Sequence, residues 1–560
     1  MNKFIGKLIF WSIGMFLILN VHAQFVPIHA DYSSIYSFID ELANDRIIDL
    51  NSVCKPYSRK QVVDWLNDAQ VNIEQLNVRQ KKEVAFYLLQ FGIDPSTSLR
   101  ERGAEARSTK HEARFLINPL SFSHTDSLFR IRIEPLWGIR QYVAGSKKLT
   151  HFWGGGSAFA YLSDGWSFYA NVRDNHMTGE TLVKESYFTQ FPGGNVKTDA
   201  NFTGSDFSEM RGGLYYANSW GSIGLAKDHV QWGDHSNGAL IFSGRTPSFP
   251  MVKLRLNPVD WMQFNYIHGW LVSEVIDSTL SYINRNSNSY RATFRKKFIA
   301  ANMFSFRLLK ATWLSVGNSI VYSDMDAHPA YLIPFMFYKS IDHTVNWGIE
   351  NQNSQMFINL SIRRIKHLHL YGSFFIDEWS FSRVNDPKSF NFTSQKAGIN
   401  LSNWPLKNLS FKYEYTQSTP ITYKHRVSTT TYESNGYNLG WFMRDNSQNI
   451  YASLEYKALK NLNVSLFYDQ SIHFNDFVYK TGYEDTLSIR KDKSWESTQM
   501  GLKIRYQIVN NIFFTADIFS NKNLGSPIDG KSSKDYLELF TSPVFRGNDK
   551  VVLLGFNMGF

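Results

Sequence analysis

Apolar and polar residues alternate with a period of two through most of the chain beyond residue 115. The clearest segments cover residues 129–134, 409–416, 450–457 and 500–507. Successive side chains of an extended strand point to opposite faces of a sheet, so each segment predicts a strand with one apolar and one polar face. The final segment, Val551 to Phe560, repeats the pattern and puts five large apolar side chains on one face: Val552, Leu554, Phe556, Met558 and Phe560.

Short and long connections separate these strands in turn. Eight short turns are predicted near residues 163–165, 218–219, 257–259, 309–311, 364–366, 403–407, 458–460 and 508–510. Long connections lie between them, and this alternation is typical of outer-membrane barrels. Eight turns give sixteen strands, and one further strand at each end of the segment gives about 18. We therefore predict an all-β transmembrane antiparallel β-barrel over residues 115–560, with its apolar face toward lipid and its charged face enclosing the interior.

Residues 24–95 follow a helical period instead. Ile35, Phe38 and Leu42 recur at helical spacing, and Ser58 with Gln61 forms a capping box before a second helix. These features predict a small N-terminal α-helical bundle. Residues 96–114 are rich in Ser, Arg and Glu and are predicted to be a linker.

Residues 1–23 have the features of a secretory signal peptide. Lys3 and Lys7 precede an apolar core, Leu8 to Leu19, which is too short to span a bilayer, and a small-residue cleavage site follows at Ala23. We therefore expect an exported protein whose barrel lies in the outer membrane and whose helical bundle lies in the periplasm. The aromatic content of 16% fits the aromatic girdles of a membrane barrel. The single cysteine, Cys54, excludes an internal disulfide framework.

Two long connections concentrate residues that suit ligand binding. In the first, Asp228 to Pro250, a tryptophan could stack on a sugar face while neighbouring polar groups bond its hydroxyls. The second, His328 to Asn353, is too apolar to be fully solvated, so it is expected to pack into the barrel mouth or to embrace a partner. The alternative for the first is a loop folded into the lumen whose polar groups satisfy one another. The candidate ligand-binding residues are Trp232, Asp234, His235, Asn237 and Arg245, with Tyr338 and Trp347 as secondary contacts.

Catalysis is the weaker interpretation of these loops. Acid–histidine neighbours occur at Asp228–His229, Asp234–His235 and Asp342–His343. Adjacent residues on an extended chain point in opposite directions, so none of these pairs makes a triad, and their spacing is a weak metal signal. The protein is predicted not to be an enzyme and to use no metal and no cofactor.

The lumen-facing side of the strands is predicted to be basic. A confined basic wall attracts anions and acidic polysaccharide, although a lattice of salt bridges across the interior is an equal alternative. The formal net charge is +10, but the basic residues are dispersed along the strands, which does not favour nucleic acid as a partner. The predicted lumen-facing basic residues are Arg130, Arg132, Arg173, Lys253, Arg255, Arg291, Arg295, Arg363, Lys412, Lys457, Lys503 and Arg505.

The order of helical bundle, linker and large barrel resembles the capsule assembly Wzi family. The resemblance is best in the bundle segment from Ile35 to Arg59 and in the barrel segment from Gln231 to Ser243. It implies an eighteen-stranded outer-membrane barrel with a periplasmic bundle, and a lectin-like role in holding capsular polysaccharide at the cell surface. The implied partners are surface polysaccharide, outer-membrane lipid and other capsule export proteins. The barrel assembly machinery is a further expected partner, because the C-terminal strand resembles its recognition signal. An anion-preferring porin or channel remains the alternative function.

Overall fold

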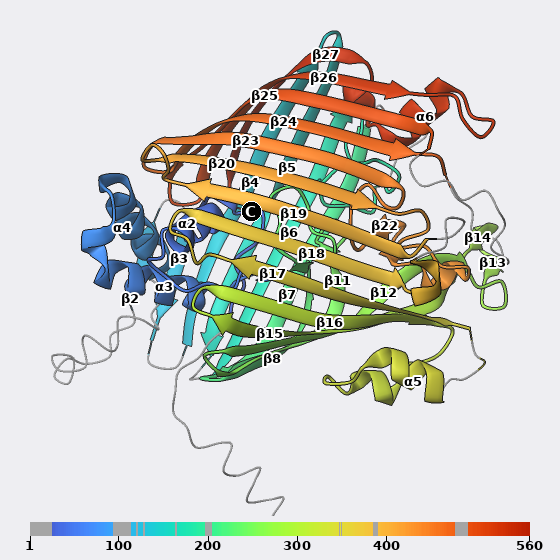
Figure 1. Cartoon of the computed structure of the whole chain (residues 1–560), viewed down its shortest axis with the longest axis horizontal. Coiled ribbons are helices and arrows are strands. Elements are labelled where there is room, and N and C mark those ends of the chain that lie inside the picture. Colours follow the sequence, from blue (N-terminus) through green and yellow to red (C-terminus); the bar gives the residue numbers. More distant parts are fainter. Residues whose placement is uncertain are drawn as a thin grey trace, which may run out of the picture.

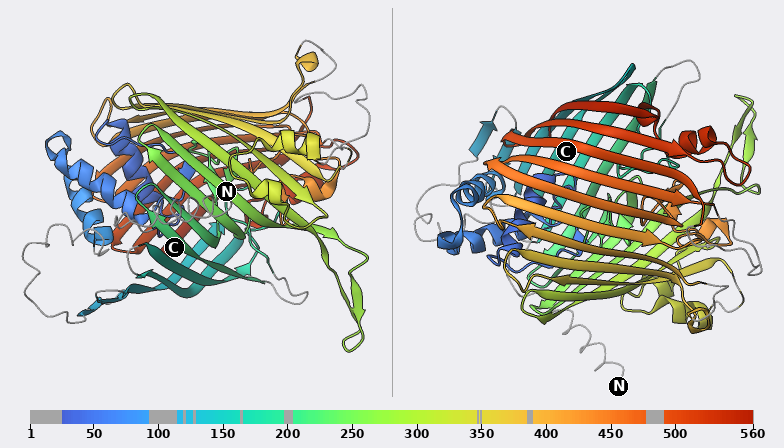
Figure 2. Two further views of the ribbon diagram at one scale, coloured as in Figure 1. Left: turned by 90° about the horizontal axis from the view of Figure 1, so that it is seen from below. Right: turned by 45° about the horizontal axis from the view of Figure 1, so that its top comes forward.

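A closed antiparallel barrel forms most of the molecule. The structure is a computed structural model and describes residues 25–92, 114–118, 121–126, 129–162, 165–196, 204–345, 348, 350–384, 390–476 and 491–559. Within these residues eighteen strands form a ring, which closes where the last strand, β27 (Asn548–Met558), pairs with the first, β4 (Phe129–Ala144). Figures 1 and 2 show this ring. The predicted fold class is confirmed.

The barrel strands turn where the sequence predicts short connections. Between β4 and β27 the ring contains β5 (Lys147–Leu162), β6 (Trp166–Gly179), β7 (Gly204–Asn218), β8 (Gly221–Asp228), β11 (Phe249–Val259), β12 (Met262–Ile276), β15 (Phe294–Leu309), β16 (Thr312–Ser323), β17 (Gln352–Ile362), β18 (Leu368–Glu378), β19 (Phe392–Ser402), β20 (Leu409–Ser418), β23 (Ser447–Leu459), β24 (Leu462–Phe474), β25 (Lys493–Val509) and β26 (Ile512–Gly525). We call the two ends of the barrel the short-turn end and the loop end.

The pairing register turns the charged face of most strands inward. Lys503 is paired with Asp517, and both side chains point into the barrel, whereas Leu554 on the opposite face is 51% exposed. Large apolar side chains on the outer face continue around the ring, for example Leu225 and Leu466. A water-soluble sheet protein would bury this face. The barrel is therefore apolar outside and polar inside, as predicted.

Three helices lie against the short-turn end, at the left of Figure 1. They are α2 (Ser33–Asn44), α3 (Arg59–Val71) and α4 (Val78–Gly92), with the short η1 (Ile73–Gln75) between the last two. The predicted capping box of Ser58 and Gln61 begins α3. A hairpin of β2 (Arg114–Asn118) and β3 (Ser121–Thr125) extends the sheet beside β4. The predicted signal peptide and most of the predicted linker lie outside the described residues. No helix in the described part of the chain is long and apolar enough to cross a membrane.

Part of the lumen is filled by the chain itself. Strand β1 (Cys54–Lys55), next to the bundle, pairs with β9 (Gln231–Trp232), which pairs with β10 (Phe242–Ser243). The hairpin of β21 (Glu433–Ser434) and β22 (Tyr437–Asn438) and the turn η5 (Ser428–Thr430) belong to a second long connection that packs on the first. We call these two connections, residues 229–248 and 419–446, the plug. The plug shares one buried apolar cluster with the inner face of β11 to β18.

The remaining long connections lie at the loop end or outside the barrel. They contain the hairpin of β13 (Tyr282–Asn284) and β14 (Ser289–Arg291), the turn η4 (Phe381–Arg383), and α6 (Ser533–Phe540) with η6 (Pro543–Phe545). The connection that contains η3 (Pro329–Leu332) and α5 (Tyr338–Val345) lies against the outer face of the barrel, below β16 in Figure 1. The expectation that it packs into the barrel mouth is wrong, because its aromatic residues pack on outward-facing side chains of β12, β15 and β16.

Candidate functional site: an aromatic and cationic pocket in the lumen

The tryptophan predicted to stack on a sugar is part of the plug. Trp232 is 1% exposed, and its ring meets Phe242 edge-on at 5.1 Å between centroids and Phe357 at 6.2 Å. Its backbone pairs with Cys54 on one side and Phe242 on the other. The Trp232 ring is therefore buried among protein side chains.

The polar neighbours of Trp232 bond to the N-terminal segment, the barrel wall and the plug itself. Asp234 accepts hydrogen bonds from Ser52 and from Asn359 Nδ2, the latter at 2.7 Å. His235 bonds to the Gly233 carbonyl oxygen at 2.8 Å, and burial lowers the pKa of His235 to about 4. Asp234 and His235 thus bond to different groups and do not pair with each other. This arrangement corresponds to the alternative in which the loop folds into the lumen and satisfies its own polar groups.

Asn237 and Arg245 also bond to protein groups. Asn237 donates from Nδ2 to Asn449 Oδ1 and Asp469 Oδ2, both at 3.0 Å. Arg245 is 1% exposed and donates from Nε to the Thr189 carbonyl oxygen at 2.7 Å and from Nη2 to the Tyr187 carbonyl oxygen. Burial lowers the pKa of Arg245 to about 9. Arg245 therefore fixes the connection between β6 and β7.

The secondary contacts lie elsewhere. Tyr338 is fully buried between α5 and the outer wall, so it is remote from the lumen, and Trp347 lies outside the described residues. The register places predicted basic residues of the barrel strands, such as Arg132, Lys253, Lys412 and Lys503, on the inward side. Arg363 follows the end of β17, and Arg291 belongs to the β13–β14 hairpin, outside the barrel ring. Several of them have acidic partners: Lys412 pairs with Glu455 at 2.7 Å, and Arg363 with Asp40 at 3.2 Å. The salt-bridge lattice accounts for these pairs.

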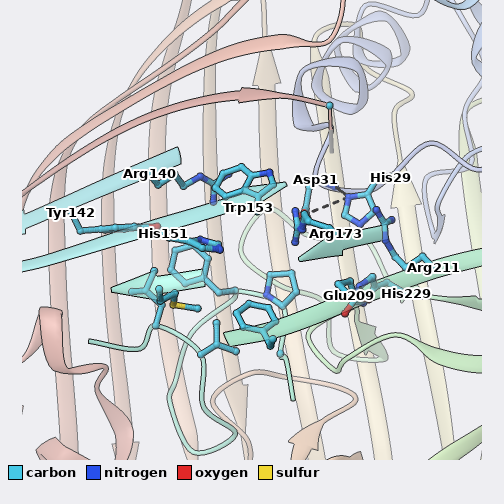
Figure 3. A pocket seen from close by; sticks show the side chains of 18 residues that line it. His29, Asp31, Arg140, Tyr142, His151, Trp153, Arg173, Glu209, Arg211 and His229 are labelled. Atoms are coloured by element: carbon cyan, nitrogen blue, oxygen red, sulfur yellow. Dashed lines mark hydrogen bonds and ion pairs between the residues drawn. The ribbon is translucent and has the colours of Figure 1, made fainter. Parts of the chain in front are cut away.

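The pocket in Figure 3 lies on the inner wall of β4 to β7, beside the start of the first plug connection. The wall contributes Arg140 and Tyr142 from β4, His151 and Trp153 from β5, Arg173 from β6, and Glu209 and Arg211 from β7. His29 and Asp31, just before α2, and His229, just after β8, close its other side. The pocket thus joins the barrel wall, the N-terminal segment and the first plug connection.

Two guanidinium groups flank one indole ring in this pocket. The Cζ atoms of Arg140 and Arg173 lie 5.2 and 5.8 Å from the Trp153 ring centroid. Neither group has a carboxylate within 4.0 Å among the described residues. On the far side, His229 Nε2 lies 3.4 Å from Glu209 Oε1, and the His29 ring meets the His229 ring edge-on. Two cations beside one aromatic ring can receive an anion, and the carboxylates of Asp31 and Glu209 line the same pocket.

Two larger cavities lie beside the pocket in the same half of the lumen and share lining residues with it. A cavity of about 370 Å³ reaches the loop end between residues 187–191, α6 and the wall of β24 to β26. A second, of about 330 Å³, lies between the bundle and the wall of β23 to β26. Arg140 lines the pocket and both cavities, and Lys503 and Arg505 line both cavities. The half of the lumen that lies away from the plug therefore holds three neighbouring cavities with basic and aromatic linings.

Sequence reasoning missed most of this site. Of the predicted ligand-binding residues, Asn237 lines the 370 Å³ cavity, and none lines the pocket of Figure 3. The pocket residues lie in regular strands, where alternation shows only that they face inward. The signal that could have found them is the shared parity of Arg140, Trp153 and Arg173 on three consecutive strands, which requires the register between those strands.

A closed barrel with a lipid-facing apolar exterior and a polar interior defines an outer-membrane β-barrel protein. Neither a family model nor a curated protein sequence matches this chain. Among solved structures, Wzi of Escherichia coli, an outer-membrane protein involved in group 1 capsule assembly and a carbohydrate-binding β-barrel, is similar over 96% of this chain and 100% of its own, with a TM-score of 0.54 and 10% identity. OccAB2 of Acinetobacter baumannii is similar over 76% of this chain and 97% of its own, with a TM-score of 0.41 and 8% identity. OccK7 (OpdD) of Pseudomonas aeruginosa is similar over 77% and 99%, with a TM-score of 0.37 and 10% identity. The predicted resemblance to Wzi is confirmed for the fold.

Proposed function

We propose that this protein binds an acidic surface polysaccharide at the outer membrane and assists in its assembly or retention, without catalysis. The fold is that of a barrel which binds carbohydrate. The observation that carries the proposal is the pocket in which Arg140 and Arg173 flank Trp153. An indole face suits the apolar face of a sugar ring, and a guanidinium group binds a carboxylate with paired hydrogen bonds.

The glycan would enter from the loop end. The cavity of about 370 Å³ connects this end with Arg140 and carries aromatic side chains along its length, including Phe188, Trp495 and Phe545. In this proposal Asn237 contacts the polysaccharide in the cavity, whereas Trp232 and Arg245 keep the plug and its neighbouring loop in place. Lys503 and Arg505 supply further positive charge along the path.

Binding by the purified protein tests the proposal. Arg140→Gln and Arg173→Gln should each weaken binding to an acidic polysaccharide about tenfold or more, because each removes a charge-assisted contact of roughly 1.5–3 kcal/mol. Added salt should weaken wild-type binding as well. The matched control is Arg307→Gln: Arg307 also lies over a tryptophan, Trp313, at 6.0 Å, but it pairs with Asp49 at 2.7 Å at the short-turn end. Equal affinity in all four proteins, each correctly folded, would contradict the proposal.

The same proposal implies a route of export and an orientation of the barrel in the outer membrane. The predicted signal peptide directs export, the helical bundle at the short-turn end faces the periplasm, and β27 is the strand read by the barrel assembly machinery. Other capsule export proteins would then meet the bundle. Protease added to intact cells should cut loop-end segments and spare the bundle, and the reverse pattern would contradict this orientation.

An anion-preferring channel is the second candidate, favoured by the basic residues Arg140, Lys503 and Arg505, which line the neighbouring cavities of the lumen. The plug and the bundle occupy much of the lumen, which argues for low conductance. Planar-bilayer recording separates the two functions, since a channel requires a steady, anion-selective open state.

A further inference from the structure

Three neighbouring strands, β12, β15 and β16, carry polar side chains on both faces. Their inner face places Ile267, Met303 and Val321 in the buried cluster of the plug, with polar residues such as Ser305 and Ser319 on the same side. Their outer face carries polar groups as well: the register puts Tyr266, His268, Asn302, Asn318 and Tyr322 there. Polar side chains on a lipid-facing surface are costly unless something pairs with them.

The connection over residues 324–345, which we call the strap, provides these partners. The Tyr266 hydroxyl donates to the Tyr331 carbonyl oxygen at 2.9 Å. Asn302 Nδ2 lies 2.8 Å from the carbonyl oxygens of both Pro334 and Met336. The polar residues of the wall therefore bond mainly to the backbone of the strap and not to its side chains.

Further bonds join the strap to the same wall, both at the start of α5 and at the loop end. The Tyr338 backbone N–H donates to Asn318 Oδ1 at 2.9 Å, where α5 begins. At the loop end, Lys296 pairs with Asp326 at 2.6 Å, and Arg295 with Asp324 at 3.4 Å. Side-chain bonds to irregular backbone are the condition under which such backbone is tolerated at membrane depth.

The strap lies at the level of barrel residues that face lipid on the neighbouring strands. Residues paired across neighbouring strands form a row around the barrel. The row that contains Asn302 and Asn318 continues into apolar outward-facing residues in both directions: Ile223, Leu254, Met356 and Ile376. One row nearer the short-turn end, the Phe335 ring lies 4.7 Å from Phe264, whose strand begins only at Met262. Ile358, in the same row as Phe264, is 41% exposed. The strap thus covers part of the apolar belt from the outside.

The outward side of the strap is itself apolar. Five consecutive or nearly consecutive residues are exposed by 39 to 56%: Leu332, Ile333, Phe335, Met336 and Phe337. We propose that the strap lies in the hydrocarbon region of the outer membrane, with these side chains in contact with acyl chains. Continuity with the lipid-facing belt selects lipid over water or a protein partner, and the bonds from Tyr266, Asn302 and Asn318 allow irregular backbone to enter that layer.

Depth measurement by spin labelling tests this proposal. A nitroxide would be attached to Phe335→Cys in a Cys54→Ala background, and the protein reconstituted in liposomes. Its collisions with oxygen, which concentrates in the bilayer core, and with a water-soluble nickel chelate would be compared with two matched sites. Ile358→Cys reports a lipid-facing position, and Tyr290→Cys reports the exposed β13–β14 hairpin, where Tyr290 is 58% exposed.

The proposal expects the Phe335 label to match the Ile358 label, with frequent oxygen collisions and few nickel collisions. A Phe335 label that matches the Tyr290 label would overturn it, because the strap would then be in water. Protection from both reagents would also overturn it, and dipolar broadening between labels would then identify a second copy as the cover. Replacing Asn302 and Asn318 by leucine should expose the Phe335 label to nickel while barrel migration on unheated gels stays unchanged. An unchanged label in that variant would show that these side chains do not hold the strap.

Discussion

Glu41→Gln should loosen the contact between the helical bundle and the barrel. Glu41 lies on α2 and is 2% exposed; it accepts hydrogen bonds from Arg79 on α4, from Lys457 on β23 at 2.5 Å, and from Asn403 at 2.9 Å. Among the described residues it is therefore the one carboxylate that forms ion pairs with both a second bundle helix and a barrel lysine. The isosteric glutamine keeps the shape but removes the charge.

The cost can be bounded from this geometry. Removing one partner of a buried ion pair destabilises by about 3–5 kcal/mol, because the remaining charge stays buried without compensation. Here that charge is Lys457, since Arg79 also pairs with Glu83. A loss of about 3 kcal/mol corresponds to roughly a hundredfold faster local opening. Hydrogen exchange of α2 and α4 in detergent micelles measures this directly.

Asp64→Asn is the matched control. Asp64 pairs with Lys60 at 2.6 Å on the exposed face of α3, where the two side chains are 52% and 31% exposed. An exposed pair of this kind contributes about 0.3–0.5 kcal/mol, so exchange should change by less than about threefold. If Glu41→Gln behaved like Asp64→Asn, the ion network would not be what holds the bundle to the barrel.

The pH dependence gives an independent check of the same network. Burial alone would raise the pKa of Glu41, but the Lys457 and Arg79 cations outweigh it and lower the pKa from 4.5 to about 2. A carboxylate with a lowered pKa in the folded state contributes stability that is complete above its unfolded pKa and is lost as the pH falls through the folded value. The difference between wild type and Glu41→Gln should therefore be constant above pH 4.5 and shrink toward pH 2. A difference that grows on acidification would refute the reasoning.

Two further predictions concern the plug. Trp232→Ala should lower the free energy of unfolding by about 3–5 kcal/mol, measured by denaturant titration, and leave the glycan affinity of the folded protein unchanged, because the ring is 1% exposed and packs on Phe242 and Phe357; a selective loss of affinity would return Trp232 to the binding site. Deleting residues 231–243, which contain β9 and β10, should convert a low-conductance barrel into an anion-preferring pore in planar bilayers, because Arg140, Lys503 and Arg505 then line an open path; unchanged conductance would show that the plug is not the barrier.

The barrel could be predicted from the sequence because its signals are local. Strand alternation and turn chemistry act over a few residues, so the eight short turns fall where the strands turn in the structure. The inward direction of Lys503 and Arg505 follows from the same alternation once lipid is taken as the outer solvent. The helices also follow from local spacing and from the capping box of Ser58.

The site could not be predicted in the same way, because it depends on contacts between distant segments. Trp232 and Arg245 have the chemistry of a sugar site, but they are buried by pairing with Cys54 and by the carbonyls of residues 187–189, which only tertiary structure brings together. The position of the strap was predicted wrongly for a related reason. A period of two identifies the two faces of β15 and β16 without stating which is outside, and here Asn302 and Asn318 face outward.

The strap and the plug cover opposite faces of the same strands. This arrangement explains why the plug fills one side of the lumen and the cavities lie on the other. Strands β12, β15 and β16 are covered on the inside by the plug and on the outside by the strap, so this sector is buried on both faces, as in a soluble sandwich. Apolar residues of its inner face pack against Trp232 and its neighbours. The plug is therefore held to one side of the barrel, and the opposite wall, from β23 through β27 to β7, keeps its cavities and basic side chains. Arg140 lines the pocket and both cavities, so a ligand that binds along this wall lies close to its guanidinium group.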